Sequence, residues 1–111
     1  MNWIELNAPL MKELNIDLLS YSLIFTIYKR QLILRPLTAK YKGLETLFGV
    51  STSTISLRMR QLLKRGIIKI EVLKSKKVLS LSDYTMYLFQ NTYQDHKEEI
   101  KMMEYDSLFR G

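Results

Sequence analysis

The spacing of apolar residues predicts two helices in the first third of the chain. Asp17 suits the N-cap of a helix that ends at the Arg35–Pro36 pair, because proline stops a helix. The apolar face of this helix repeats at near-helical spacing through Leu19, Leu23, Ile27 and then Gln31 or Leu34. Asn7, followed by Pro9 in a first helical turn, predicts a shorter preceding helix that runs to about Leu14.

A second pair of helices follows, with a sharp turn between them. The first covers about residues 42–48 and is expected to bury one face, made of Leu44, Leu47 and Phe48. Gly49 suits the end of this helix, because glycine adopts a left-handed backbone conformation at little cost. Val50 then provides an apolar plug, and Ser51 suits the next N-cap. The helix behind Ser51 is expected to turn its apolar stripe inward, through Ile55, Met59, Leu62 and Leu63.

Alternating β-branched residues predict a hairpin after these helices. Ile67 to Val72 is expected to form one strand and Val78 to Leu81 the other, with a loop over residues 73–77. Ser82 suits the cap of one last helix, over about residues 83–106, with an apolar stripe at alternating spacings of three and four. A small domain cannot cover so long a stripe alone. We therefore expect a dimer interface at Met86, Phe89, Tyr93, Ile100 and Met103.

Composition agrees with a single domain, and the distribution of charge indicates the kind of partner that the chain binds. The chain has 111 residues, of which 47% are hydrophobic, so residues 1–111 are expected to form one mainly α-helical domain with a small β-hairpin. The formal net charge is +6, but it is unevenly distributed. Residues 35–77 carry eleven basic and two acidic residues, a balance of +9, whereas residues 78–111 carry three basic and six acidic residues, a balance of −3. This pattern indicates a polyanionic partner for the middle of the chain.

The side chains that most enzymes and metal sites need are scarce. The chain has no cysteine and one histidine, His96, so neither a metal site nor a nucleophile paired with histidine is expected. No phosphate-binding glycine loop occurs, and the C-terminal carboxylates lack a paired arrangement for acid–base catalysis. We expect no enzyme activity, no cofactor and no metal. No apolar run is long enough to span a membrane, and the first residues lack a basic signal region, so a cytoplasmic protein without membrane binding is expected.

The segment over residues 44–68, LETLFGVSTSTISLRMRQLLKRGII, resembles the winged helix-turn-helix family. The resemblance lies in the glycine at the turn, the apolar residue and serine cap that follow it, Thr-Ile in the second helix, and Leu-x-x-x-Gly-Ile-Ile leading into the hairpin. It covers about residues 18–82, with the helix-turn-helix at about 42–65 and the wing, the hairpin that gives the family its name, at 67–81. The resemblance implies sequence-specific binding of double-stranded DNA by a homodimer.

Candidate DNA contacts follow from this resemblance and from the charges. Small hydroxyl side chains in the first turn of the second helix are expected to meet phosphates and base edges, and Leu57 suits a thymine methyl group. Arg58 is a candidate for a guanine edge, whereas Arg60 and Lys64 suit phosphates. The wing lysines are expected to add salt-dependent affinity. The full set is Lys42, Ser51, Thr52, Ser53, Thr54, Ser56, Leu57, Arg58, Arg60, Lys64, Lys74, Lys76 and Lys77.

Within the family, the chain is most similar to the TubR-type adaptors of plasmid and phage DNA partition. It shares their approximate length, a helix before the motif, a hydroxyl-rich recognition helix and Leu-Ser-Asp after the wing. The resemblance implies a centromere-binding role and a tubulin-like GTPase as partner, with a docking surface expected at Glu98, Glu99, Glu104 and Asp106. Two alternatives stay open. One is a transcription repressor with an apolar effector cavity between the first and last helices, and the other is a protein-interaction module that does not bind DNA.

Overall fold

The computed structural model describes residues 3–40 and 43–109, and Lys42, a predicted DNA contact, lies outside these ranges. The described part is mainly helical with one two-stranded antiparallel hairpin, which confirms the predicted secondary-structure class. In chain order the elements are α1 (Trp3–Leu14), α2 (Leu18–Leu32), α3 (Leu44–Phe48), α4 (Thr52–Lys64), β1 (Ile68–Leu73), β2 (Lys76–Leu81), α5 (Asp83–Tyr93), the 3-10 turn η1 (Gln94–His96) and α6 (Lys97–Phe109).

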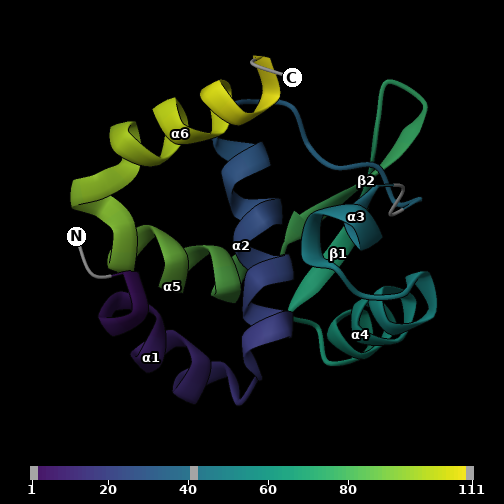
Figure 1. Cartoon of the computed structure of the whole chain (residues 1–111), viewed down its shortest axis with the longest axis horizontal. Helices are drawn as coiled ribbons and strands as arrows, with labels where there is room; N and C mark the ends of the chain where they lie inside the picture. The colour runs from purple at the N-terminus through teal and green to yellow at the C-terminus, as the bar shows by residue number, and fades with distance from the viewer. Residues whose placement is uncertain (1–2, 41–42, 110–111) are drawn as a thin grey trace.

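Helix α2 lies at the centre of the molecule, with α1, α5 and α6 on one side and α3, α4 and the hairpin on the other (Figure 1). Asp17 caps it as predicted, because its side chain accepts a hydrogen bond from the Ser20 amide at 2.9 Å. Toward α5, the core is a cluster of five aromatic rings in mutual contact, namely Tyr21, Phe25, Tyr28, Phe89 and Tyr93. These rings join the N-terminal and C-terminal helices into one core.

The first helix begins earlier than predicted. Helix α1 starts at Trp3, so Pro9 lies inside it and Asn7 is not its cap. The Asn7 side chain has another role, because its Oδ1 accepts a hydrogen bond from the hydroxyl of Tyr93 at 2.7 Å. A proline inside a helix removes one backbone hydrogen bond, because it has no amide hydrogen. Pro9 lies on the exposed face of α1. The cap prediction was wrong because the helix begins at Trp3, so Asn7 lies within it.

The turn of the hairpin is shorter than predicted, and residues 37–39 pair with the hairpin in addition. Lys74 and Ser75 both have positive φ angles, 49° and 67°, as in the two-residue turns that match the twist of a hairpin. Leu73 therefore pairs directly with Lys76, and the predicted five-residue loop is absent. The segment over residues 37–39 runs along the other side of β2, with an antiparallel bridge between Thr38 and Val78. The hairpin is consequently braced against the chain that leaves α2.

The C-terminal helical stretch is long, as predicted, but η1 divides it into α5 and α6, which run in different directions (Figure 1). This bend brings α6 back onto α2, so the domain covers most of the apolar stripe itself. Phe89, Tyr93 and Ile100 are 0%, 0% and 1% exposed, and the prediction that they face a second subunit was wrong. Met86 is half-buried against the core, whereas Met103 is exposed.

Candidate nucleic-acid interface

The turn between α3 and α4 is built as its sequence predicts. Gly49 has a φ angle of 66°, in the left-handed region, and this conformation lets the chain reverse between the two helices. Ser51 caps α4, because its Oγ accepts the amide hydrogen of Thr54 at 3.2 Å. Val50 packs against the core. Leu47 was predicted to be buried but is 63% exposed, because α3 has only five residues and turns only Leu44 fully inward.

One side of α4 is buried and the other is open to solvent. Ile55, Met59 and Leu62 hold the helix against the core, and together they fix which residues point outward. The exposed side carries five of the predicted contact residues, and three more are half-buried beside them. The exposed residues are Thr52, Ser53, Leu57, Arg60 and Lys64, and the half-buried ones are Thr54, Ser56 and Arg58.

Hydroxyl groups gather at the N-terminal end of α4. The Ser51 Oγ lies 2.8 Å from the Thr54 Oγ1 and 3.1 Å from the Ser53 Oγ, so the three side chains form one hydrogen-bonded group. The N-terminus of a helix also presents backbone N–H groups and a partial positive charge, which favour phosphate oxygens. This end of α4 therefore combines donors and positive potential on an exposed surface.

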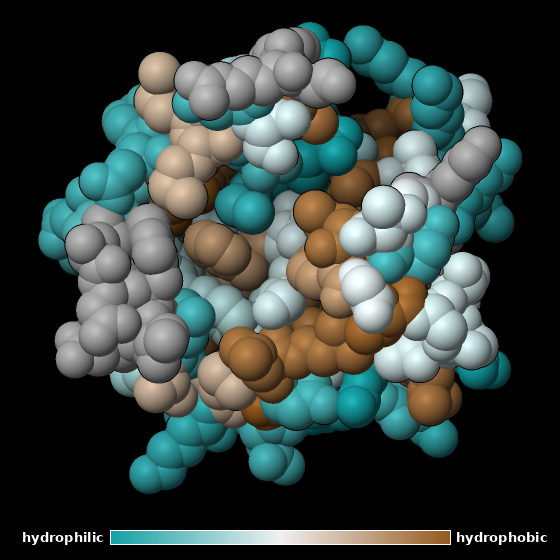
Figure 2. Space-filling model, in the orientation of Figure 1, coloured by the Kyte–Doolittle hydropathy of each residue, from teal (hydrophilic) through white to brown (hydrophobic). Residues whose placement is uncertain are grey.

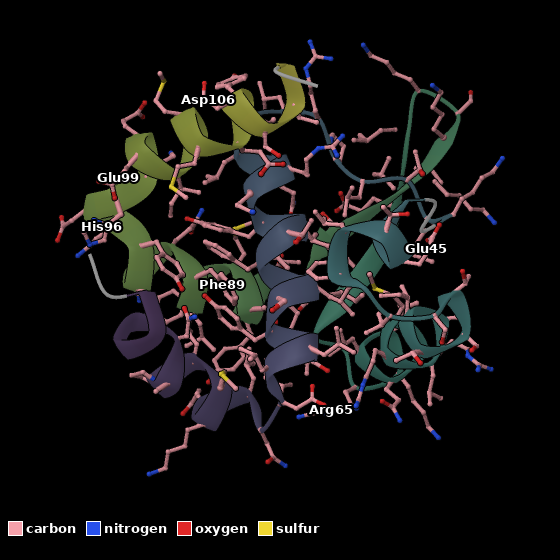
Figure 3. All side chains as sticks on the ribbon, viewed as in Figure 1. Glu45, Arg65, Phe89, His96, Glu99 and Asp106 are labelled. Carbon is pink, nitrogen blue, oxygen red and sulfur yellow. The ribbon has the colours of Figure 1, made fainter. Side chains whose placement is uncertain are left out.

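Two arginines of the α4 region anchor it to the first helices. The Arg58 Nη2 lies 2.8 Å from the Asp17 Oδ2, at the start of α2. The hydrogen bond from the Ser20 amide, together with the nearby Arg58 charge, lowers the pKa of Asp17. Arg65, labelled in Figure 3, donates to the backbone oxygens of Asn15, at 3.1 Å, and of Leu14. Arg58 was predicted to reach a guanine edge, whereas in the structure its guanidinium pairs with α2.

Lysines cluster at the turn end of the hairpin, which lies on the same side of α2 as α4 (Figure 1). Lys74 lies in the turn, and Lys76 and Lys77 lie in β2, all three exposed. An open groove of about 640 Å³ lies between residues 38–40 and residues 75–77. Lys76 and Lys77 line one wall of this groove, and Lys40 lines the opposite wall. The sequence does not predict this groove, because it depends on the pairing of residues 37–39 with β2.

A polar network fixes the hairpin to α2. The Gln31 amide donates to the Ser80 Oγ at 2.9 Å and accepts from the Leu81 backbone amide at 2.9 Å. The Ser80 hydroxyl in turn donates to Glu71 at 3.1 Å, and Glu71 pairs with Lys69 at 3.1 Å. The hydrogen bond from Lys69 and the bond from Ser80 lower the pKa of Glu71. The hairpin is therefore held in a defined orientation relative to the helices.

The acidic C-terminal region lies away from α4. Figure 3 places Glu99 and Asp106 on α6, at the opposite side of the view from the α4 helix. Glu98, Glu99 and Asp106 are exposed as predicted. Glu104 is not, because it is 7% exposed and pairs with Lys29 of α2 at 3.4 Å. The prediction that Glu104 belongs to an exposed docking surface was wrong, because this carboxylate is buried and tethers α6 to α2.

The space between α2 and α5 is filled by aromatic rings. Burial raises the pKa of Tyr21, Tyr28 and Tyr93, because the phenolate form is disfavoured away from water. The Tyr21 and Tyr93 hydroxyls are hydrogen-bonded to each other. Among the described residues, no buried side-chain nitrogen or oxygen lacks a hydrogen-bond partner. Beside this aromatic core, a pocket of about 250 Å³ lies between α2 and the end of α5, lined by Tyr28, Leu32, Gln90, Asn91, Gln94 and Lys97.

Comparison of the chain with protein-family models, with curated proteins and with solved structures found no significant match. Within the described ranges, no three or more acidic or histidine side chains are grouped in a way that would hold a metal ion. None of the helices in those ranges combines the length and the apolar character that crossing a membrane requires.

Proposed function

We propose that this protein binds double-stranded DNA in the manner of a winged helix-turn-helix protein, with α4 in the major groove and the hairpin as the wing. The observation that carries the proposal is the exposed side of α4, where a hydroxyl-rich N-terminus continues into Arg60 and Lys64, with the lysine-bearing hairpin on the same side of α2 (Figure 1). Positive charge and hydrogen-bond donors on one protruding helix match the chemistry of a DNA groove.

The two parts of this surface have different tasks in the proposal. Thr52, Ser53 and the half-buried Thr54 and Ser56 meet phosphates and base edges, and Leu57, which is 48% exposed, contacts a thymine methyl group. Arg60 and Lys64, together with the lysines of the wing, bind phosphates and supply affinity that does not depend on sequence. The other residues proposed for the contact are Ser51, Lys74, Lys76 and Lys77, whereas Arg58 is proposed to position α4 through Asp17.

The anchoring of α4 and of the hairpin supports this proposal. Reading a groove requires that the protruding helix keep a fixed angle to the rest of the protein. Here Arg58 ties α4 to the start of α2, and Arg65 ties the end of α4 to the end of α1. Gln31 ties the hairpin to the end of α2. Helix α2 therefore orients both proposed DNA-contacting elements.

The experiment is a fluorescence-anisotropy titration of labelled duplex DNA at two salt concentrations. Binding that releases counterions from six or more phosphates should weaken by about a thousandfold or more between about 50 and 200 mM salt. The double variant R60A/K64A should bind more weakly and with a smaller salt dependence. The matched control K12A/K97A removes the same charge from exposed lysines of α1 and α6 and should bind like the wild type. Equal loss in both variants would refute a site on α4.

Absence of binding to any duplex would favour the alternative of a protein-interaction module. The ligand-responsive repressor stays the alternative within DNA binding, and an apolar effector cavity between the first and last helices would favour it. The narrower role that we propose, a homodimeric partition adaptor that recruits a tubulin-like GTPase, rests on the resemblance alone. Its test is E98K/E99K, which reverses two exposed charges of α6. This variant should keep DNA binding and lose GTPase recruitment, whereas unchanged recruitment would contradict the role.

A further inference from the structure

Strand β1 forms one edge of the sheet, and its outer side is unpaired in the described part of the chain. Strand β2 is paired on both sides, with β1 and with residues 37–39. On the side of residues 37–39, the Ala39 amide donates to the Lys77 oxygen at 3.0 Å and the Leu79 amide donates to the Leu37 oxygen at 2.8 Å. Successive residues of a strand point their backbone groups to opposite sides. Val78 and Ser80 therefore pair with β1.

This alternation determines which groups of β1 are free. The register places Val78 opposite Glu71 and Ser80 opposite Lys69, so Glu71 and Lys69 use their backbone groups inside the hairpin. Ile68, Ile70 and Val72 consequently point their N–H and C=O groups away from β2, toward the open edge. Such a row of unpaired groups is a template for a further strand.

Apolar side chains make this edge unusual. Ile70 is 44% exposed, Val72 is 67% exposed and the adjacent Leu73 is 48% exposed. Figure 2 shows hydrophilic side chains around most of the rim of this face and hydrophobic ones nearer its centre. The proposed DNA contacts do not use these apolar side chains. An exposed apolar edge strand usually marks a place where another strand adds.

We propose that the edge of β1 pairs antiparallel with β1 of a second copy of this chain, with Ile70 opposite Ile70. This proposal rests on the homodimer of the proposed function and deepens it. The edge of β1 takes the place of the apolar stripe of the last helix as the dimer contact. In this register Ile70 and its counterpart exchange two backbone hydrogen bonds, and Ile68 pairs with Val72 of the second copy on either side. The groups that bond are the same ones that point outward from the hairpin.

The charges on β1 make the same strand of a second copy a favourable partner, and they favour this register over its neighbours. With Ile70 opposite itself, Lys69 lies opposite Glu71 of the second copy, in the closer, non-hydrogen-bonded type of pair. Both side chains are on one face and already lie 3.1 Å apart within one chain, so four charges alternate in sign across the interface. The neighbouring permitted registers would place Lys69 opposite Lys69 or Glu71 opposite Glu71, and like charges opposite each other are unfavourable.

The first test is disulfide cross-linking with a mild oxidant, because the chain has no cysteine of its own. In the proposed register the two copies of residue 70 have Cα atoms about 5.5 Å apart, within the range of about 4.4–6.8 Å that a disulfide spans. I70C should therefore form covalent dimers. V72C is the matched control, because Val72 is more exposed than Ile70 but its two copies would lie about 13 Å apart. Equal or better cross-linking of V72C would overturn the register.

The second test is charge exchange, followed by sedimentation over a concentration series without DNA. K69E and E71K each place like charges opposite each other and should weaken dimerisation roughly tenfold. The double variant K69E/E71K restores opposite charges across the two-fold axis and should restore the dimer. Circular dichroism of each variant shows whether the hairpin is folded. A wild type that stays monomeric, or single variants that dimerise as the wild type does, would overturn the proposal. Because DNA is absent, neither result depends on whether the protein binds DNA.

Discussion

The triple variant K74A/K76A/K77A removes the exposed lysines of the wing and leaves α4 unchanged. These lysines lie in the turn and in β2, where their side chains are exposed. The variant should therefore fold as the wild type does. If the hairpin binds phosphates as proposed, the affinity for duplex DNA should fall, and its dependence on salt should fall with it.

The expected magnitude follows from the number of exposed cations on the proposed interface. Six are available in the described residues, namely the five proposed contacts Arg60, Lys64, Lys74, Lys76 and Lys77 together with Lys40, which lines the groove beside the wing lysines. Each phosphate contact contributes about 0.9 to the slope of log K against log salt, so six contacts give a slope of about −5.4. A fourfold increase in salt then weakens the wild type by roughly a thousandfold, but the triple variant, with a slope of about −2.7, by only about fortyfold.

The assay is a salt series of anisotropy titrations on one duplex. The control K12A/K97A/K101A removes three lysines from α1 and α6, so it matches the loss of net charge without touching the wing. The control should keep the wild-type slope. A triple wing variant with an unchanged slope, or a control whose slope falls as far, would refute the reasoning that the hairpin contacts phosphates.

Three further predictions concern stability and ionisation. F89A removes a fully buried ring from the aromatic cluster and should lower the free energy of unfolding by about 3–5 kcal/mol in urea titrations, whereas a surface position would cost far less. The pKa of Asp17 in the folded protein lies below its ordinary value of 3.8. Its contribution to stability is therefore present above the unfolded pKa and is lost as the pH falls through the folded pKa. D17N should therefore show a smaller loss of stability below about pH 4 than the wild type, and equal acid sensitivity would contradict this. Burial raises the pKa of Tyr21, Tyr28 and Tyr93. These three of the seven tyrosines should therefore stay protonated at pH 10 in an ultraviolet titration. Ionisation of all seven tyrosines near pH 10 without unfolding would contradict this prediction.

The parts of the fold that the sequence predicts are those with a local physical cause. Asp17 and Ser51 cap the helices that follow them, because a short polar side chain bonds an amide three residues later. Gly49 ends α3 in the left-handed region, as glycine allows. The inward stripe of α4 follows from helical periodicity. These features place the proposed DNA surface without any knowledge of the rest of the molecule.

The parts that the sequence does not predict depend on distant contacts. The stripe of the last helix looks like one long interface until η1 bends it and α2 covers Phe89 and Ile100. The turn at Lys74 and Ser75 has positive φ angles without the Asn-Gly signal that usually announces them. Residues 37–39 are too few to show the alternation of a strand, so their pairing with β2 emerges only from the fold. The groove beside the wing has the same origin.

The most direct test of DNA binding through α4 and the wing is an NMR titration of the isotope-labelled protein with duplex DNA, followed through the backbone amides. The account predicts that the largest shift changes fall at residues 51–64 and 74–77, while the amides of α5 and α6 change little. Shift changes concentrated on α5 and α6, or none at any DNA concentration in low salt, would contradict it.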